Sequence, residues 1–423
     1  MRPRRSLTVA FAAVAVLFVS SAGPTPPVDE AGGLLHGVNL ITEDIGTRQA
    51  KLHQVADAIQ DLVDSHTPGT DGYAGIIVDP TARALALYWK GELPPLVSTI
   101  ISTRTPDQYT VSVHPARFSR AELDRAIDVF VAATRGSAGE WSSVFRQEQG
   151  SGIRITYQPT TSHRIAGPMP SADRYAARAA AMTGVPVSAT PGQGFVPLAG
   201  SRGAARGPWD AGAELRTPRG SFCSTGFGGF KGNQRVLLTA AHCGPLGDYR
   251  TGDGQVVGPG LESNSALDVA LVGIDQTPEG RFFDSAWNSP STRGLYGAGR
   301  NNVGDLTCTS GAASGYHCDV ELTGVEGRMA NEHGDVISPV DVGEHRGGHA
   351  VVVALGDSGG PVVADPAGPQ AAMTARGIIV AGGKGTQIQC RGGSDTAVDT
   401  VCFWQVMYVP MTPILNTFGI SLS

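Results

Sequence analysis

Cysteine is absent from the first half of the chain, and all six cysteines fall between residues 223 and 402. No Cys-x-x-Cys pair occurs, which argues against a structural zinc site. The formal net charge of -6 provides no basic surface for nucleic acid. Beyond residue 23, no apolar run is long enough to cross a bilayer. We therefore expect no nucleic-acid partner, no metal and no cofactor.

The N-terminus combines a basic start with a short apolar stretch. Three arginines within the first five residues precede SLTVAFAAVAVLFVSSAG, which ends in small residues such as Ser20 and Ala22. This pattern is typical of a secretory signal peptide, here residues 1–23, and the alternative is an uncleaved membrane anchor. We expect a secreted, extracellular protein that has no membrane contact once the signal is removed.

In an exported chain, an even number of cysteines predicts disulfides. Six cysteines allow 15 pairings, and their spacing along this sequence favours three pairs of neighbours. The predicted pairs are Cys223 with Cys243, Cys308 with Cys318, and Cys390 with Cys402.

The chain divides into two units of different composition. Residues 24–200 alternate between helical periodicity and short strands, which predicts an α+β unit, most clearly in segments 48–66, 74–89, 119–136 and 173–184. Residues 201–208 end a stretch rich in Gly and Pro that predicts an exposed linker. Residues 209–423 hold many short apolar runs between glycine turns, which predicts an all-β sandwich or barrel. The histidines of the first unit are expected at its surface: His36, His53, His66, His114 and His163.

Two motifs in the second unit carry residue types suited to nucleophilic catalysis. LLTAAHC contains His242, and GDSGGP contains Ser358. A serine hydroxyl becomes a nucleophile when a base takes its proton, and a third group must hold that base in one tautomer. Asp268 lies among apolar residues, where a buried carboxylate needs a partner such as an imidazole N–H. The sequence therefore predicts a triad of His242, Asp268 and Ser358.

Together, these motifs resemble the chymotrypsin-like (trypsin-like) serine proteases. CSTGF, CTSGAASGYHC and LNTFGISL make the sequence most similar to secreted bacterial enzymes of the streptogrisin and α-lytic protease type. The resemblance covers residues 209–423 and implies two six-stranded antiparallel β-barrels with the triad in their cleft. It also implies a monomeric serine endopeptidase that cleaves polypeptide substrates through an acyl-enzyme. Residues 35–190 resemble, more loosely, the pro-region that assists folding in these precursors.

The resemblance also implies an oxyanion hole and a specificity pocket. Backbone N–H groups of Gly356 and Ser358 would bind the oxyanion. The residues implied for the pocket are Val352, Ala381, Gly382, Gly383 and Val401. Two valines would narrow the pocket and favour small or medium apolar side chains before the scissile bond. Alternatively, Val401 points into the core, and the pocket admits Phe or Tyr.

Two positions depart from the family pattern. Thr309 stands where the bacterial enzymes carry an arginine that pairs with the aspartate of GDSGGP, so Asp357 needs another residue or a released N-terminal amine as its partner. Ala381 replaces a common serine. These departures leave open a catalytically impaired binding protein on a protease fold.

A metallohydrolase is a further alternative. The three histidines it would use are His333, His345 and His349. The glycines of HRGGH make a shared helix face improbable, which favours a solvated loop.

Overall fold

The structure is a computed structural model that describes residues 43–134, 141–157, 171–192, 195–196, 202–203, 205–244, 246–331, 334–364, 373–390, 395–397 and 400–423. The predicted signal peptide, His36, His163 and His333 lie outside these ranges. Among the described helices, none has both the length and the apolar character that a membrane span requires.

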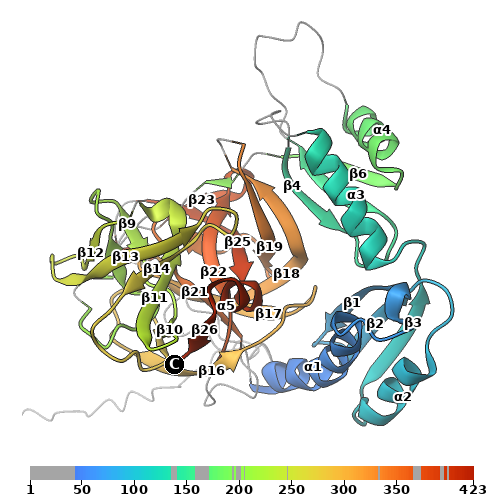
Figure 1. Ribbon diagram of the computed structural model, residues 1–423, viewed down its shortest axis with the longest axis horizontal. Helices are drawn as coiled ribbons and strands as arrows, with labels where there is room; N and C mark the ends of the chain where they lie inside the picture. Colours follow the sequence, from blue (N-terminus) through green and yellow to red (C-terminus); the bar gives the residue numbers. More distant parts are fainter. Residues whose placement is uncertain are drawn as a thin grey trace, which may run out of the picture.

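The N-terminal unit mixes helices with short strands, as the sequence predicts (Figure 1). Its helices are α1 (Glu43–Asp64), α2 (Pro95–Arg104), α3 (Arg120–Ala133) and α4 (Ala172–Thr183). Its strands are β1 (Tyr73–Asp79), β2 (Ala84–Trp89), β3 (Thr110–Pro115), β4 (Trp141–Arg146), β5 (Ile153–Tyr157), β6 (Val187–Pro191) and β7 (Phe195–Val196).

Capping residues define the ends of these helices. Ser119 and Glu122 form a reciprocal capping box at the start of α3, which satisfies backbone N–H groups that have no partner within the helix. Helix α4 ends where Gly184 takes the left-handed conformation (φ 72°) that glycine adopts without strain. The apolar face of α1 contributes Leu52 and Ile59 to a core shared with β1 and β2. The expected α+β unit is thus confirmed.

In the described remainder of the chain, the regular secondary structure is almost entirely β-strand, which confirms the predicted all-β unit. One sheet has eight strands in the order β26, β10, β11, β14, β13, β12, β8, β9. These strands are β8 (Glu214–Arg216), β9 (Phe222–Ser224), β10 (Gly228–Lys231), β11 (Gln234–Ala240), β12 (Asp248–Arg250), β13 (Val256–Asn264), β14 (Val269–Gly273) and β26 (Ile420–Leu422).

The second β body contains a closed ring of six strands. In the ring, β22 pairs with β21, then β17, β18, β19 and β25 follow, and β25 pairs again with β22. The ring strands are β17 (Leu306–Gly311), β18 (Gly315–Ala330), β19 (Val336–His345), β21 (Pro361–Ala364), β22 (Met373–Gly383) and β25 (Gln405–Pro410). The expected pair of six-stranded barrels is therefore met in part, because the first sheet is instead a path of eight strands.

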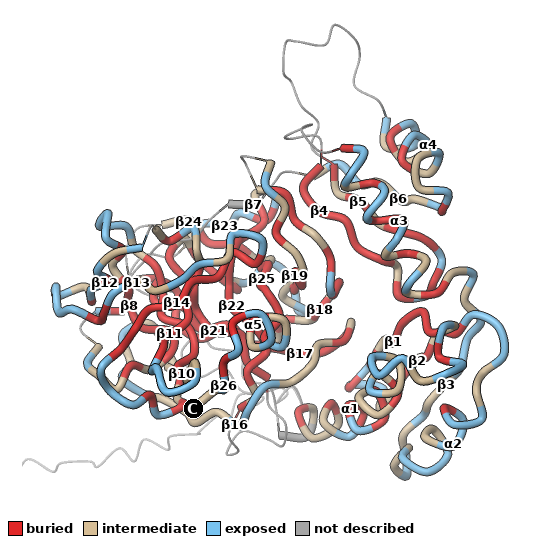
Figure 2. Tube along the Cα trace, in the orientation of Figure 1, coloured by how far each residue is buried: buried red, intermediate tan, exposed pale blue. Residues whose placement is uncertain are grey.

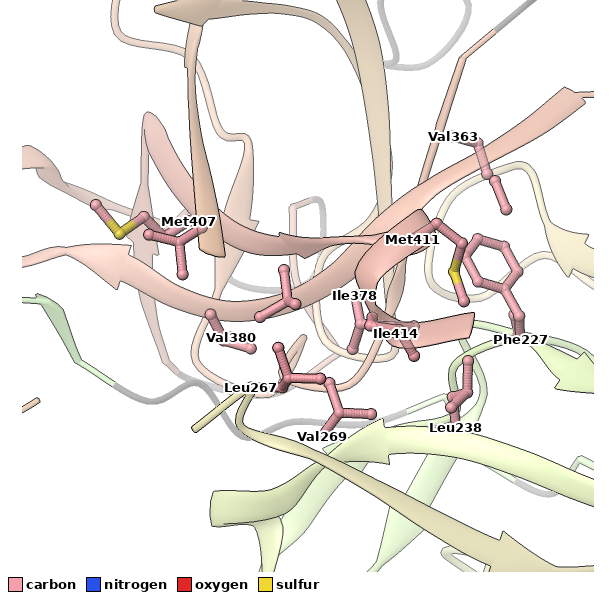
Figure 3. Close-up of a cluster of buried hydrophobic side chains, with 14 of the residues drawn as sticks. Phe227, Leu238, Leu267, Val269, Val363, Ile378, Val380, Met407, Met411 and Ile414 are labelled. Carbon is pink, nitrogen blue, oxygen red and sulfur yellow. The ribbon is translucent and has the colours of Figure 1, made fainter. Parts of the chain in front are cut away.

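Shorter elements complete this unit. They are β15 (Arg281–Phe283), β16 (Thr292–Ala298), helix α5 (Met411–Phe418), and a small sheet of β20 (Val353–Ala354), β23 (Gln387–Gln389) and β24 (Val401–Phe403). Buried chain is concentrated in the strands of this unit (Figure 2). Figure 3 shows side chains from both β bodies and α5 in one apolar cluster, including Leu238, Val269, Ile378 and Met411. Because this core is shared, the two bodies fix each other's position.

The N-terminal unit is attached to the second β body at several points. Strand β4 pairs with β18 and extends its sheet through β5 and β6. From α1, the Gln49 side chain replaces a strand partner: its Oε1 accepts from Leu306 N (2.6 Å) and its Nε2 donates to Leu306 O (3.2 Å). Covering a strand edge in this way satisfies backbone groups that would otherwise be left without partners.

Candidate functional site

Neighbouring strands bring His242 and Asp268 together. His242 lies in the 3₁₀ turn Ala241–Cys243 that follows β11, and Asp268 directly precedes β14. Strands β11 and β14 are antiparallel, with Ala240 opposite Val269, so the two functional residues meet at the same end of the pair. Asp268 has a positive φ of 53°, an uncommon conformation that aspartate tolerates better than most residues.

The three residues of the predicted triad form a continuous chain of hydrogen-bonded groups. His242 Nδ1 lies 2.5 Å from Asp268 Oδ2, and the backbone N–H of His242 donates to Asp268 Oδ1 at 2.8 Å. His242 Nε2 lies 2.8 Å from Ser358 Oγ. Two contacts to one carboxylate fix the orientation of the imidazole ring. The remaining ring nitrogen is thereby directed at the serine hydroxyl.

The turn that holds Ser358 depends on its glycines. Gly356 (φ 124°) and Gly359 (φ 87°) take backbone conformations that other residues rarely adopt. A Cβ at Gly359 would lie 2.3 Å from Thr239 Oγ1, so this turn packs directly against β11. Ser224 Oγ donates to the carbonyl of Gly356 at 2.8 Å. The GDSGGP motif is therefore an ordered turn held against the first sheet.

Asp357 binds a neighbouring turn through four hydrogen bonds. Its Oδ1 accepts from the backbone N–H groups of Ala313 (2.8 Å) and Ser314 (3.1 Å). Its Oδ2 accepts from Ser314 Oγ (2.5 Å) and Ala354 N (2.7 Å). Burial raises the pKa of Asp357, and these hydrogen bonds oppose the rise. Thr309 takes no part, because its hydroxyl donates to Val352 O at 2.5 Å.

All three disulfides join the neighbours that the spacing predicts, so this prediction is confirmed. Cys223–Cys243 ties β9 to the turn of His242, Cys308–Cys318 links β17 to β18, and Cys390–Cys402 braces the small sheet that carries Val401. Two of these bridges thus lie beside predicted site residues.

The expected pocket residues come from three segments: Val352 directly precedes β20, Val401 begins β24, and residues 381–383 end β22. Val352 is fully buried and belongs to one cluster with Val401, which is half-buried. The sequence-based reasoning missed Phe403, whose backbone carbonyl accepts from Val352 N at 2.8 Å. A Cβ at Gly382 would lie 2.6 Å from Phe403 Cγ, so this ring fills the space beneath Gly382. In the sequence, the only sign of this contact is an aromatic residue two positions after Val401.

The end of the N-terminal unit pairs with the same region. Strand β7 is antiparallel to β22, with Val196 opposite Gly382 and Phe195 opposite Gly383. Ala381 directly precedes this paired segment, is 2% exposed and lies opposite Met407 of β25. The backbone of β7 therefore occupies the strand edge formed by two of the predicted pocket residues.

The two histidines of the metal alternative that the structure describes, His345 and His349, make separate contacts. His345 Nδ1 lies 3.0 Å from Gly348 O, and the His349 ring stacks on Trp404 with ring centroids 4.5 Å apart. Over the described part of the chain, no group of three or more His, Cys, Asp or Glu residues is arranged to hold a metal ion.

His53 is not at the surface, so that prediction is wrong. It is 7% exposed and its Nε2 lies 2.6 Å from Asp305 Oδ1 in the second β body. Burial by itself lowers the pKa of His53, but the charges and hydrogen bonds of Asp305 and Asp57 raise it to about 9. The helical pattern of α1 alone cannot reveal this, because the acid that contacts His53 is 252 positions away in the chain. His66 and His114 are exposed as predicted.

No protein-family model matches the chain, and no curated protein matches it. Among solved structures, the chain is similar to a glutamic-acid-specific serine protease at 22% identity, over 51% of this chain and 100% of that one, with a TM-score of 0.39. It is similar to the Nocardiopsis protease NAPase at 21% identity, over 50% and 97%, with a TM-score of 0.37. Thermobifida fusca protease A matches at 22% identity, over 50% and 97%, with a TM-score of 0.37. These neighbours are bacterial chymotrypsin-like serine proteases.

Proposed function

We propose that the chain is the precursor of a secreted serine endopeptidase. The observation that carries the proposal is the chain of contacts from Asp268 through His242 to Ser358. A base within hydrogen-bond reach of a serine, itself oriented by a buried carboxylate, is the arrangement that activates a hydroxyl for attack on a carbonyl. The three disulfides support an oxidising, extracellular location.

In the proposed mechanism, Ser358 Oγ attacks the scissile carbonyl carbon while His242 Nε2 accepts the hydroxyl proton. Asp268 stabilises the resulting imidazolium through its contact with Nδ1. The N–H groups of Gly356 and Ser358 donate to the oxyanion of the tetrahedral intermediate. His242 then protonates the leaving amine and an acyl-enzyme remains. Water attacks the acyl carbon with His242 again as base, which releases the acid and restores the serine.

Residues 24–200 act, in this proposal, as a pro-region that assists folding and is later removed. Two features support it: the unit extends the sheet of β18 through β4, and its last strand covers the edge at Gly382 and Gly383. A peptide substrate would need that same edge for main-chain hydrogen bonds. The attached precursor is therefore expected to be inactive toward other polypeptides.

Active-site labelling tests the central proposal. The processed, folded chain is expected to react with a fluorophosphonate at one residue, because only an activated serine is nucleophilic enough. Peptide mass spectrometry should place the adduct on Ser358, and the same chain unfolded in denaturant should remain unlabelled. If the folded chain is also unlabelled, the impaired binding protein is the better description.

Peptides that differ only in the residue before the scissile bond test the pocket. We expect fastest cleavage after Ala, Val or Leu, because Val352 and Val401 offer no charge and Phe403 fills the space under Gly382. Preferences of roughly 10- to 200-fold per methylene are typical of apolar pockets. In kcat/KM measurements, fastest cleavage after Arg would contradict the pocket assignment. Fastest cleavage after Phe would show that the two valines leave the pocket open.

A further inference from the structure

The site described above contains one buried charge whose partner the sequence did not reveal. Asp357 lies between Gly356 and Ser358, is 0% exposed, and holds the nucleophile turn to the turn of Ala313 and Ser314. A buried carboxylate without a nearby positive charge is costly even when it is hydrogen-bonded. The ionised form of Asp357 therefore depends on a cation within the same interior.

Arg202 provides a buried positive charge beside this turn. It is 5% exposed, although the composition around it predicts an exposed linker. Its Nη1 donates to Ser310 Oγ (2.9 Å) and Gly212 O (3.3 Å), and its Nη2 donates to Ser285 O (2.5 Å). Such a set of protein acceptors is what allows a guanidinium to remain charged in the interior.

Arg202 and Asp357 lie against adjacent residues of β17. Ser310, which binds the guanidinium, is followed by Gly311, where a Cβ would lie 2.0 Å from Asp357 Cγ. Strand β17 thus has the cation against Ser310 and the carboxylate against the next residue. Protein, and not water, lies between these two buried charges. Their attraction is therefore screened only weakly.

The other nearby acid already has a partner. Asp284 Oδ2 lies 3.3 Å from Arg293 Nε, whereas the direct contacts of Asp357 in the described chain are neutral donors. Burial lowers the pKa of Arg202 to about 10, and the charges of Asp357 and Asp284 oppose that fall. Arg202 is therefore protonated at neutral pH and available to Asp357.

The backbone of Arg202 belongs to the first β body. Its carbonyl accepts from Glu214 N at 3.1 Å, which attaches it to the start of β8. Further along, Trp209 is 3% exposed, and Ala211 forms a β-bridge with Phe282. Strand β7, by contrast, lies on the edge of β22 and ends at Val196. The described residues Val196 and Arg202 thus belong to different parts of the fold: Val196 to the edge of β22, and Arg202 to the first β body.

We propose that Arg202 remains with the protease after maturation and is the positioning residue that keeps Asp357 ionised, so that processing falls on the N-terminal side of Arg202. This proposal rests on the proposed protease function. A cut after Arg202 would free its chain end and weaken the hold of Asp357 on the turns around Ser358. The arginine takes the place of the cation that is missing at Thr309.

The first test is the N-terminus of the mature protein. Full-length chain is allowed to mature, and intact mass together with N-terminal sequencing locates the cut. We expect the mature chain to begin at residue 202 or earlier. A fully active mature chain that begins at 203 or later overturns the proposal, and this measurement needs no variant to fold.

The second test is the acid limb of the pH profile. In Arg202→Met, the pKa of Asp357 is expected to rise, so the acid limb of kcat/KM should move up by about one pH unit or more. Arg202→Lys retains the charge and should bring the acid limb most of the way back to its wild-type position. Arg206→Met is the matched control, because Arg206 is largely exposed and paired with Asp253. An unchanged acid limb in folded Arg202→Met overturns the proposal.

The fluorophosphonate reaction separates the two hypotheses. A wild-type mature chain that is not labelled contradicts the protease function itself. A labelled wild type whose Arg202→Met variant keeps the wild-type pH profile contradicts only the role of Arg202. Circular dichroism of each variant confirms that the fold is retained before its profile is compared.

Discussion

Replacing Ser358 with alanine is expected to lower kcat/KM for peptide hydrolysis by about 10⁴- to 10⁶-fold. The reason is that His242 then has no hydroxyl to deprotonate, and no acyl-enzyme can form. The residual rate reflects substrate binding and the oxyanion hole alone. Initial rates on a chromogenic peptide, with enzyme quantified by absorbance, measure the loss.

Ser263→Ala is the matched control for this substitution. Ser263 is an exposed serine of β13, far from the turn of Ser358 in the sequence. Its removal should leave kcat/KM within about twofold, as expected for a surface position. If Ser358→Ala keeps near-normal activity after contaminating proteases are excluded, the acyl-enzyme mechanism is wrong.

Refolding of the mature chain is expected to depend on the N-terminal unit. Denatured residues 202–423 should recover activity about 100-fold faster, or more, when residues 24–200 are supplied in trans. The ring of the second β body closes by pairing strands that are distant in sequence, such as β25 with both β19 and β22, and such pairing forms slowly. Strand β4 and α1 provide a preformed partner for β18 and for Leu306. The measurement is recovered peptidase activity against time after dilution from denaturant.

The contact between His53 and Asp305 provides a variant that tests how tightly the N-terminal unit binds the mature chain. The N-terminal unit that carries His53→Ala should inhibit the mature chain more weakly, with an inhibition constant raised by about 30-fold or more. Losses of this size are typical when one partner of a buried charge pair is removed. His66→Ala is the matched control, because His66 is exposed and its Nδ1 lies 2.9 Å from Asp64 O of its own segment. If activity is recovered equally fast with and without the N-terminal unit, that unit does not assist folding. This conclusion holds for any inhibition constant of the His53 variant.

The same contact gives the complex a pH dependence with a defined sign. The pKa of His53 rises from 6.5 to about 9 in the complex, where Asp305, Asp57 and Arg376 face it. A raised pKa means that the protonated form binds better. The contribution of His53 is therefore complete below pH 6.5 and is lost as the pH rises through 9. The His53→Ala unit should lack this part of the pH dependence.

Much of the candidate site follows from local sequence. The GDSGGP turn needs glycines at positive φ, and LLTAAHC couples an apolar strand to a histidine, so each motif carries its own backbone requirement. The neighbouring cysteine pairs were predictable because short loops close with little entropy loss. The α+β and all-β units follow from the change from helical to strand periodicity.

The strand count and the pocket required the tertiary structure. Which strands close into the ring of six depends on pairing between segments that share no sequence pattern. Phe403 reads in sequence as one more apolar strand residue, and only its position beneath Gly382 relates it to the pocket. Periodicity identifies a buried face but does not say which space that face fills.

The sequence by itself thus determined the chemistry of the site, namely a serine, a histidine and an aspartate in motifs that specify their own local backbone, together with the disulfides and the two units. Only the tertiary structure decided where the charges are balanced. Arg202 lies in a segment whose composition indicates a linker, yet it is buried against Ser310, next to the residue that packs on Asp357. His53 lies on a helix whose pattern indicates a free surface, yet it is buried against Asp305, which is distant in the chain. Propensity and periodicity describe a segment and its neighbours in sequence, whereas the cost of a buried charge depends on every group that packs around it.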